Sequence, residues 1–122
     1  KKEMFFFPVG PLLKALGAVP INRSRSTGMV EQVIAYFNQN EKFCVCITPE
    51  GTRKANKEWK KGFYYIALKA NIPILLYGLD YKRKLIKCSR TFIPTGNVEK
   101  DTEEIKQYFT EFEGKHPERF II

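Results

Sequence analysis

Segments with a helical period alternate with short apolar runs along this chain, and this alternation constrains its fold more than any other feature. The segments with the period of an amphipathic helix are Pro8–Leu16, a stretch from Ser26 or Thr27 to about Asn40, Gly62–Ala70, and a last stretch that begins near Asp101. The runs typical of strands are Val19–Asn22, Phe43–Thr48, Ile72–Leu79 and Lys84–Ile93. This order predicts an α/β fold whose central sheet is largely parallel or mixed and is flanked by helices.

Local residue types refine three of these predictions. Phe43–Thr48 is short and mostly apolar, so we expect a strand buried on both faces, ended by Pro49. Alternating basic residues in Lys84–Ile93 indicate an edge strand. Asp101 and Glu104 have the spacing of a capping box and predict the start of the last helix. No linker or repeat interrupts the pattern, so we expect one domain over residues 1–122.

The chain is strongly basic, with 21 Lys and Arg against 13 Asp and Glu and a formal charge of +8. This excess favours an anionic partner, which could be nucleic acid, a phosphorylated substrate or an acidic membrane surface, and the charge does not choose among them. No apolar run approaches the roughly 20 residues that span a bilayer. Any membrane association is therefore expected to be peripheral, with release by salt.

The cysteine pattern predicts neither a disulfide framework nor a metal site. The chain has three cysteines, Cys44, Cys46 and Cys88, and an odd number argues against a purely disulfide-bonded framework. No second pair of ligands accompanies Cys44 and Cys46, so zinc is not expected. The three residues are interpreted as small apolar side chains in a reducing compartment.

A polar loop follows directly after the predicted strand Phe43–Thr48. Gly51 lets backbone N–H groups approach an anion, Thr52 offers a hydroxyl, and Arg53 offers a planar guanidinium suited to phosphate. Glu50 adds a carboxylate that could orient a neighbouring cation. Ligands of α/β sheets bind outside the carboxyl ends of strands, which favours a phosphate site here. A polar turn with a surface ion pair accounts for the same residues.

The segment Pro49–Arg53, which reads P-E-G-T-R, resembles the most distinctive block of the glycerolipid acyltransferase family, F-P-E-G-T-R-S. Thr48 stands in place of the phenylalanine and Lys54 in place of the serine. Three further segments resemble family blocks in the same order: Gly17–Arg23, Trp59–Gly62 and Asn71–Leu76. On this resemblance the chain is identified as a member of the family, similar to the lysophosphatidic acid acyltransferases.

The resemblance implies a fold like that of glycerol-3-phosphate acyltransferase and a reaction in phospholipid synthesis. An acyl chain would pass from acyl-CoA or acyl-carrier protein to the hydroxyl of a lysophosphatidic-acid-like acceptor, without a cofactor or a metal. The residues that it assigns to the acceptor phosphate site are Arg23, Glu50, Gly51, Thr52, Arg53 and Lys60. It also implies a cytoplasmic protein associated peripherally with an anionic membrane surface.

The two arginines of this set carry a geometric prediction. Arg23 follows the predicted strand Val19–Asn22, and Arg53 follows the predicted strand Phe43–Thr48. If these strands are parallel neighbours, both guanidinium groups emerge at one edge of the sheet and converge on one pocket. Two such groups repel each other unless an anion or Glu50 lies between them, so their convergence would indicate a binding site.

The catalytic block of the family, His-x-x-x-x-Asp, precedes all four of these segments and is not found in this chain. The only histidine is His116, which has Ile121 five positions after it, and we interpret it as an exposed tail residue. We therefore expect the catalytic pair on residues before Lys1, with this chain as the C-terminal portion of the domain. The alternative is a non-catalytic phosphate- or lipid-binding relative. A nucleic-acid binder, supported by charge and aromatic content alone, ranks third.

Overall fold

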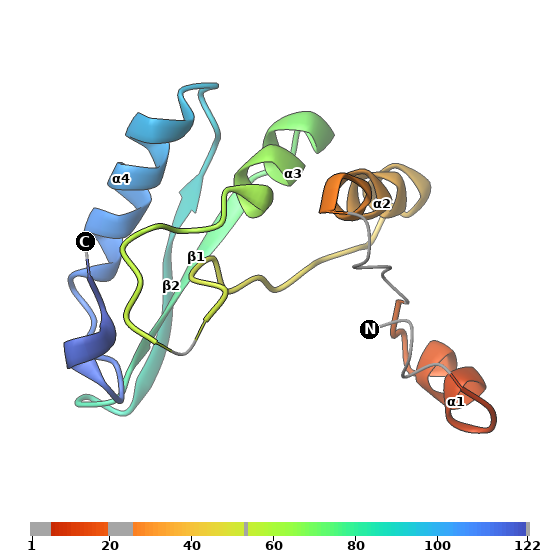
Figure 1. Ribbon diagram of the computed structural model, residues 1–122, viewed down its shortest axis with the longest axis horizontal. Coiled ribbons are helices and arrows are strands. Elements are labelled where there is room, and N and C mark those ends of the chain that lie inside the picture. The colour runs from red at the N-terminus through yellow and green to blue at the C-terminus, as the bar shows by residue number, and fades with distance from the viewer. Residues whose placement is uncertain (1–5, 20–25, 53, 122) are drawn as a thin grey trace. The chain divides into compact units, whose positions relative to one another are not determined.

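A computed structural model describes residues 6–19, 26–52 and 54–121, with only the backbone of Ser26 and Thr27. The helices and strands follow one another in the order α1 (Val9–Ala15), α2 (Ser26–Gln39), α3 (Gly62–Ala70), β1 (Ile74–Asp80), β2 (Leu85–Phe92), α4 (Val98–Phe109) and the 3₁₀ helix η2 (Pro117–Arg119) (Figure 1). The chain divides into two compact units, Lys1–Cys44 and Val45–Ile122. The sequence predicts one domain over residues 1–122. A single domain unfolds as one cooperative unit, and the division does not test this, so the single domain stays a prediction.

The first unit contains α1 and α2 where the helical period predicts them. Gly17 follows α1 with a φ of 83°, and its N–H donates to the carbonyl of Lys14 at 2.9 Å. This left-handed glycine ends the helix, as expected from its position. Within α2, Val33 is buried, and the ring of Phe37 lies edge-on to that of Phe43 with centroids 4.8 Å apart. These contacts confirm the apolar face that the spacing of α2 predicts.

The second unit is built on an antiparallel hairpin of β1 and β2. The register runs from Ile74 opposite Phe92 to Asp80 opposite Leu85. Exposed and buried residues alternate along β1, so one face of the hairpin packs into a core. Both strands lie within the ranges predicted for them to within one residue, and α3 has the predicted bounds.

The core of this unit lies where α3 and α4 run beside the hairpin (Figure 1). Its buried cluster consists of Trp59, Leu76, Phe92, Ile105 and Tyr108. Close packing also explains Gly78 in β1, because a Cβ added there would lie 2.5 Å from the ring of Phe112. Phe112, in the segment that follows α4, thus packs against the backbone of the sheet.

The prediction for the start of α4 is wrong in its detail. The helix begins at Val98, and the side chain of Asn97 caps it by accepting a hydrogen bond from the N–H of Lys100 at 3.1 Å. Asp101 lies within the helix and is 1% exposed. Its carboxylate accepts hydrogen bonds from Tyr64 and Thr95 and does not cap the helix, whose N-cap is Asn97.

The predicted parallel or mixed central sheet is not confirmed by the described residues, in which the sheet consists of the two antiparallel strands alone. The predicted buried strand Phe43–Thr48 is wrong here: the segment forms no strand, and its residues from Cys44 onward are exposed. An apolar run sets a preference for extended backbone, but a strand also needs a neighbour that completes its hydrogen bonds. The predicted strand Val19–Asn22 lies largely outside the described residues.

Two further observations concern the surface. Within the described ranges no helix has the length and the apolar character needed to cross a membrane. Cys44, Cys46 and Cys88 are free and exposed.

Candidate functional site

The loop that follows Thr48 is closed at its base by backbone hydrogen bonds. The N–H of Lys60 donates to the carbonyl of Pro49 at 2.7 Å, and the N–H of Gly51 donates to the carbonyl of Thr48 at 3.3 Å. We call residues 49–60 the acceptor loop. Because its two ends are joined, the loop holds its shape without belonging to a helix or a strand.

Gly51 and Lys60 lie against each other within the acceptor loop. Gly51 has a φ of 66°, in the left-handed region that side chains disfavour. A Cβ built on Gly51 would lie 3.2 Å from Cγ and 3.8 Å from Cε of Lys60, so the aliphatic part of this lysine crosses the glycine. Lys60 as a whole is exposed. The loop thus brings together two of the residues that the sequence assigns to the phosphate site.

Thr52 and Glu50 complete the described part of that set. The hydroxyl of Thr52 accepts a hydrogen bond from the N–H of Lys54 at 3.1 Å, which turns the chain just after the glycine. The Glu50 carbonyl accepts from the side-chain amide of Asn56 at 3.3 Å. Glu50, Gly51, Thr52 and Lys60 therefore belong to one braced loop.

Asn56 is a residue that the sequence analysis missed. Its amide nitrogen also donates to the carbonyl of Glu58 at 2.8 Å, and its side-chain oxygen accepts from the N–H of Glu58 at 3.0 Å. Asn56 thereby connects the two sides of the acceptor loop. An asparagine in a polar stretch without a helical or strand period is the signal that could have identified it.

An open groove of about 1060 Å³ lies beside the acceptor loop, and Glu50 and Thr52 are among its lining residues. Aromatic side chains line it as well, among them Trp59, Phe109, Phe112 and Phe120. Its charged lining residues carry both signs, for example Lys54 and Glu111. A groove with aromatic rings and mixed charges suits an amphipathic ligand with an ionised head.

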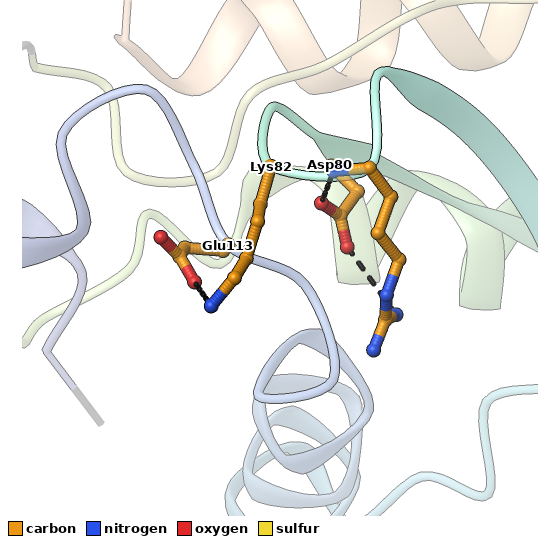
Figure 2. A network of polar contacts seen from close by, with 4 residues as sticks. Asp80, Lys82 and Glu113 are labelled. Carbon is orange, nitrogen blue, oxygen red and sulfur yellow. Dashed lines mark hydrogen bonds and ion pairs between the residues drawn. The ribbon is translucent and has the colours of Figure 1, made fainter.

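One ion pair joins the hairpin turn to the segment after α4 at this groove, and a second lies within the turn (Figure 2). The Nζ atom of Lys82 lies 3.0 Å from the Glu113 carboxylate, and the backbone N–H of Tyr81 donates to the Glu113 carbonyl at 2.8 Å. Asp80 is 3% exposed and accepts from the N–H of Arg83 at 2.8 Å and from its guanidinium at 3.4 Å. Lys82 and Arg83 thus pair with carboxylates in the lining of the groove.

The remaining sequence predictions have separate outcomes. Arg23 and Arg53 lie outside the described residues, so their convergence on one pocket stays a prediction. His116 lines the groove, and its side chain is 49% exposed with Nδ1 3.5 Å from a carboxylate oxygen of Glu118. Among the described residues, no group of three or more His, Cys, Asp or Glu could hold a metal ion.

A buried carboxylate outside the acceptor loop links α3 to α4 by a hydrogen bond. Burial acts to raise the pKa of Asp101, but hydrogen bonds from the N–H of Thr95 and the hydroxyls of Tyr64 and Thr95 outweigh it, and the pKa lies below its ordinary value. These bonds measure 2.7, 2.7 and 2.9 Å. Burial and the bond to Asp101 raise the pKa of Tyr64. The pair holds two helices together and takes no part in the groove.

The geometry of the acceptor loop indicates what kind of ligand it can take. An exposed lysine and a threonine hydroxyl lie close to a left-handed glycine in a loop closed by hydrogen bonds. Ammonium and hydroxyl groups donate to anionic oxygens, and a glycine leaves room for such a group to approach the backbone. The loop therefore suits a phosphate better than a neutral ligand.

Comparisons with known proteins agree on one family. The family model described as Acyltransferase matches residues 1–77. The human (Homo sapiens) 1-acyl-sn-glycerol-3-phosphate acyltransferase beta is 32% identical to the chain over 105 residues, which cover 80% of this chain and 37% of that protein. The chain therefore spans well under half the length of this relative. No solved structure matches the chain.

Proposed function

Because this chain belongs to the acyltransferase family, we propose that it provides the acceptor-binding part of an enzyme of phospholipid synthesis. The reaction is acyl transfer from acyl-CoA or acyl-carrier protein to the hydroxyl of a lysophosphatidic-acid-like acceptor. The acceptor loop carries the proposal, because a hydroxyl, a lysine and a left-handed glycine lie together there, and Arg53 follows Thr52 in the sequence. The name of the human relative specifies an acceptor with a phosphate, and this supports an anion as the ligand.

The proposed role of the loop is to position the acceptor for attack. Arg23 and Arg53 bind the phosphate through charge-assisted hydrogen bonds, and Lys60 adds positive charge. A histidine of a His-x-x-x-x-Asp block takes the proton from the acceptor hydroxyl, and the aspartate orients the imidazole. The hydroxyl oxygen bonds to the thioester carbonyl carbon, the carbon–sulfur bond breaks, and the thiol leaves with a proton. Holding the phosphate places the hydroxyl beside the base, which lowers the entropic part of the barrier.

Replacement of Arg53 by lysine tests this assignment. The substitution keeps the charge but loses the bidentate fork that matches phosphate. One charge-assisted contact contributes about 1.5–3 kcal/mol, so we expect the KM for the acceptor to rise about tenfold or more. The KM for the acyl donor should change little. The measurement is steady-state kinetics on the enzyme with an intact His-x-x-x-x-Asp block.

The same substitution at Arg90 is the matched control. Arg90 lies in β2, pairs with Glu104 of α4 and does not line the groove. Arg90→Lys should leave both KM values close to those of the unsubstituted enzyme. An unchanged acceptor KM in Arg53→Lys would refute the assignment, as would equal increases in both KM values.

A further inference from the structure

We propose that Lys106 of α4 is a positioning residue for the acceptor loop and thereby for the acceptor phosphate. The second half of this inference rests on the proposed function. Lys106 lies 49 residues beyond its hydrogen-bond partner Lys57. It is outside the four segments that resemble family blocks. Its role follows from the contacts that a buried ammonium group makes with the loop.

Lys106 is a buried charge with an unusual set of partners. It is only 7% exposed, and within the described part of the chain no carboxylate lies within ion-pairing distance of it. Burying an ammonium group is unfavourable unless other groups compensate for the lost water. A methionine at this position would pack in the same place without that cost. The contacts of the ammonium group therefore indicate what the lysine does at this position.

Both compensating contacts of Lys106 belong to the acceptor loop. Its Nζ donates a hydrogen bond to the carbonyl of Lys57 at 2.8 Å. The same nitrogen lies 5.8 Å from the centroid of the Trp59 ring, within the range of a cation–π contact. Trp59 in turn is buried against Phe63 and Phe109, so the loop is anchored to α3 and α4 at this point.

A short chain of hydrogen bonds connects this anchor with the residues of the phosphate site. Lys57 lies between Asn56 and Glu58, and the Asn56 amide bonds the carbonyls of both Glu58 and Glu50. Glu50 directly precedes Gly51 and Thr52. Fixing the Lys57 carbonyl therefore fixes the Asn56 side chain, and that side chain holds the backbone at the start of the phosphate-binding turn.

The test compares Lys106→Met with Tyr108→Phe in this chain. Methionine fills a similar volume against Trp59 but cannot donate to the Lys57 carbonyl. The Tyr108 hydroxyl, on the same helix, donates to the carbonyl of Leu76 at 3.2 Å and bonds with Ser89 at 3.0 Å, so Tyr108→Phe weakens α4 without touching the loop. Lys106→Arg keeps a charged donor, so it should retain part of the hydrogen bonding to the Lys57 carbonyl that Lys106→Met loses.

Two measurements separate positioning from stability. Amide hydrogen exchange of Lys60 and Gly51, whose N–H groups close the acceptor loop, should be faster by about tenfold or more in Lys106→Met and unchanged in Tyr108→Phe. An NMR titration with glycerol 3-phosphate should show about tenfold weaker binding in Lys106→Met alone. Thermal unfolding of all the variants establishes that each is folded under the conditions used.

Each outcome decides a different question. Unchanged exchange of the loop amides in Lys106→Met would overturn the inference. Equal loss of binding in Lys106→Met and Tyr108→Phe would overturn it as well, because it would indicate a general effect of stability. A third outcome is that the loop amides exchange faster in Lys106→Met, but the unsubstituted chain does not bind glycerol 3-phosphate. This would support the anchoring by Lys106 and overturn the proposed phosphate site.

Discussion

Gly51 shows how one residue without a side chain determines the geometry of the acceptor loop. Its φ of 66° turns the chain, and Cγ of Lys60 lies 3.2 Å from the position that a Cβ would take. A residue with a side chain would be strained at this φ and would also displace the lysine. The close contact between Gly51 and Lys60 therefore depends on glycine at this position.

Replacing Gly51 with alanine should affect both stability and binding. The left-handed conformation costs an alanine about 1–2 kcal/mol, and the new methyl group would lie 3.2 Å from Cγ of Lys60. We expect Gly51→Ala to lower the free energy of unfolding by about that amount and to weaken the binding of glycerol 3-phosphate. Urea denaturation and an NMR titration measure the two effects.

Gly114 provides the matched control for this substitution. An added Cβ at Gly114 meets no atom within 4 Å, and its φ lies outside the left-handed region. Gly114→Ala should therefore leave stability unchanged or raise it slightly, because alanine restricts the unfolded chain. If Gly51→Ala behaved like Gly114→Ala in both measurements, the tight approach of Lys60 would have no energetic role.

At the level of elements, one buried carboxylate links α3 to α4. Asp101 of α4 accepts from Tyr64 of α3 and from two groups of Thr95, which lies in the connection between β2 and α4. The hydroxyl of Tyr64 also accepts from the N–H of Gly96 at 2.9 Å. Two helices and a connecting segment thus share a single network, in which every bond to the carboxylate favours its ionised form.

Asp101→Asn should therefore destabilise the protein in a pH-dependent manner. Asparagine has nearly the same shape but replaces one acceptor oxygen with a donor, so we expect a loss of about 2 kcal/mol near neutral pH. The pKa of Asp101 is lowered in the folded state. Its stabilising contribution is thus present above the unfolded pKa of about 3.9 and is lost as the pH falls through the folded pKa.

Urea denaturation between about pH 7 and pH 3 checks this prediction. The difference in unfolding free energy between the parent chain and Asp101→Asn should shrink below about pH 4. Glu103→Gln, at an exposed position of the same helix, serves as the control and should show a small difference at every pH. A difference that stayed constant down to the lowest pH would contradict the lowered pKa.

At the level of the whole molecule, the proposed binding residues and the only histidine of the sequence can be placed relative to the two compact units. The described residues form two compact units, and the acceptor loop and its groove both belong to Val45–Ile122. The single histidine lies in that unit too, beside Glu118. Nothing in this arrangement repeats the spacing of the catalytic pair.

We accordingly predict that the chain alone does not transfer acyl groups. Without a base that removes its proton, the acceptor hydroxyl remains a weak nucleophile. The measurement is thiol release from acyl-CoA with and without a lysophosphatidic-acid-like acceptor, with an enzyme that has the complete His-x-x-x-x-Asp block as the positive control. Acceptor-dependent release by the chain alone would contradict the prediction, and its loss in His116→Ala would identify the base.

The sequence by itself determined the local features of this protein. Helical periods located α1, α2 and α3, because the spacing of apolar residues along one face is a property of neighbours in the chain. The P-E-G-T-R segment and its companion blocks indicated the family, which the comparisons confirm. The assignment of six residues to the phosphate site stays a prediction. Four of the six, Glu50, Gly51, Thr52 and Lys60, are described and lie in the acceptor loop.

Tertiary structure decided the features that depend on distant partners. The run Phe43–Thr48 resembles a buried strand, yet a strand exists only where another backbone completes its hydrogen bonds, and apolar content does not specify that partner. Asp101 has the spacing of a cap, but the donors of Tyr64 and Thr95 make it a buried acceptor. Lys106 reads as an ordinary surface lysine until folding places it beneath a loop from 49 residues earlier. In each case the energy comes from contacts between residues far apart in the chain, which no local pattern records.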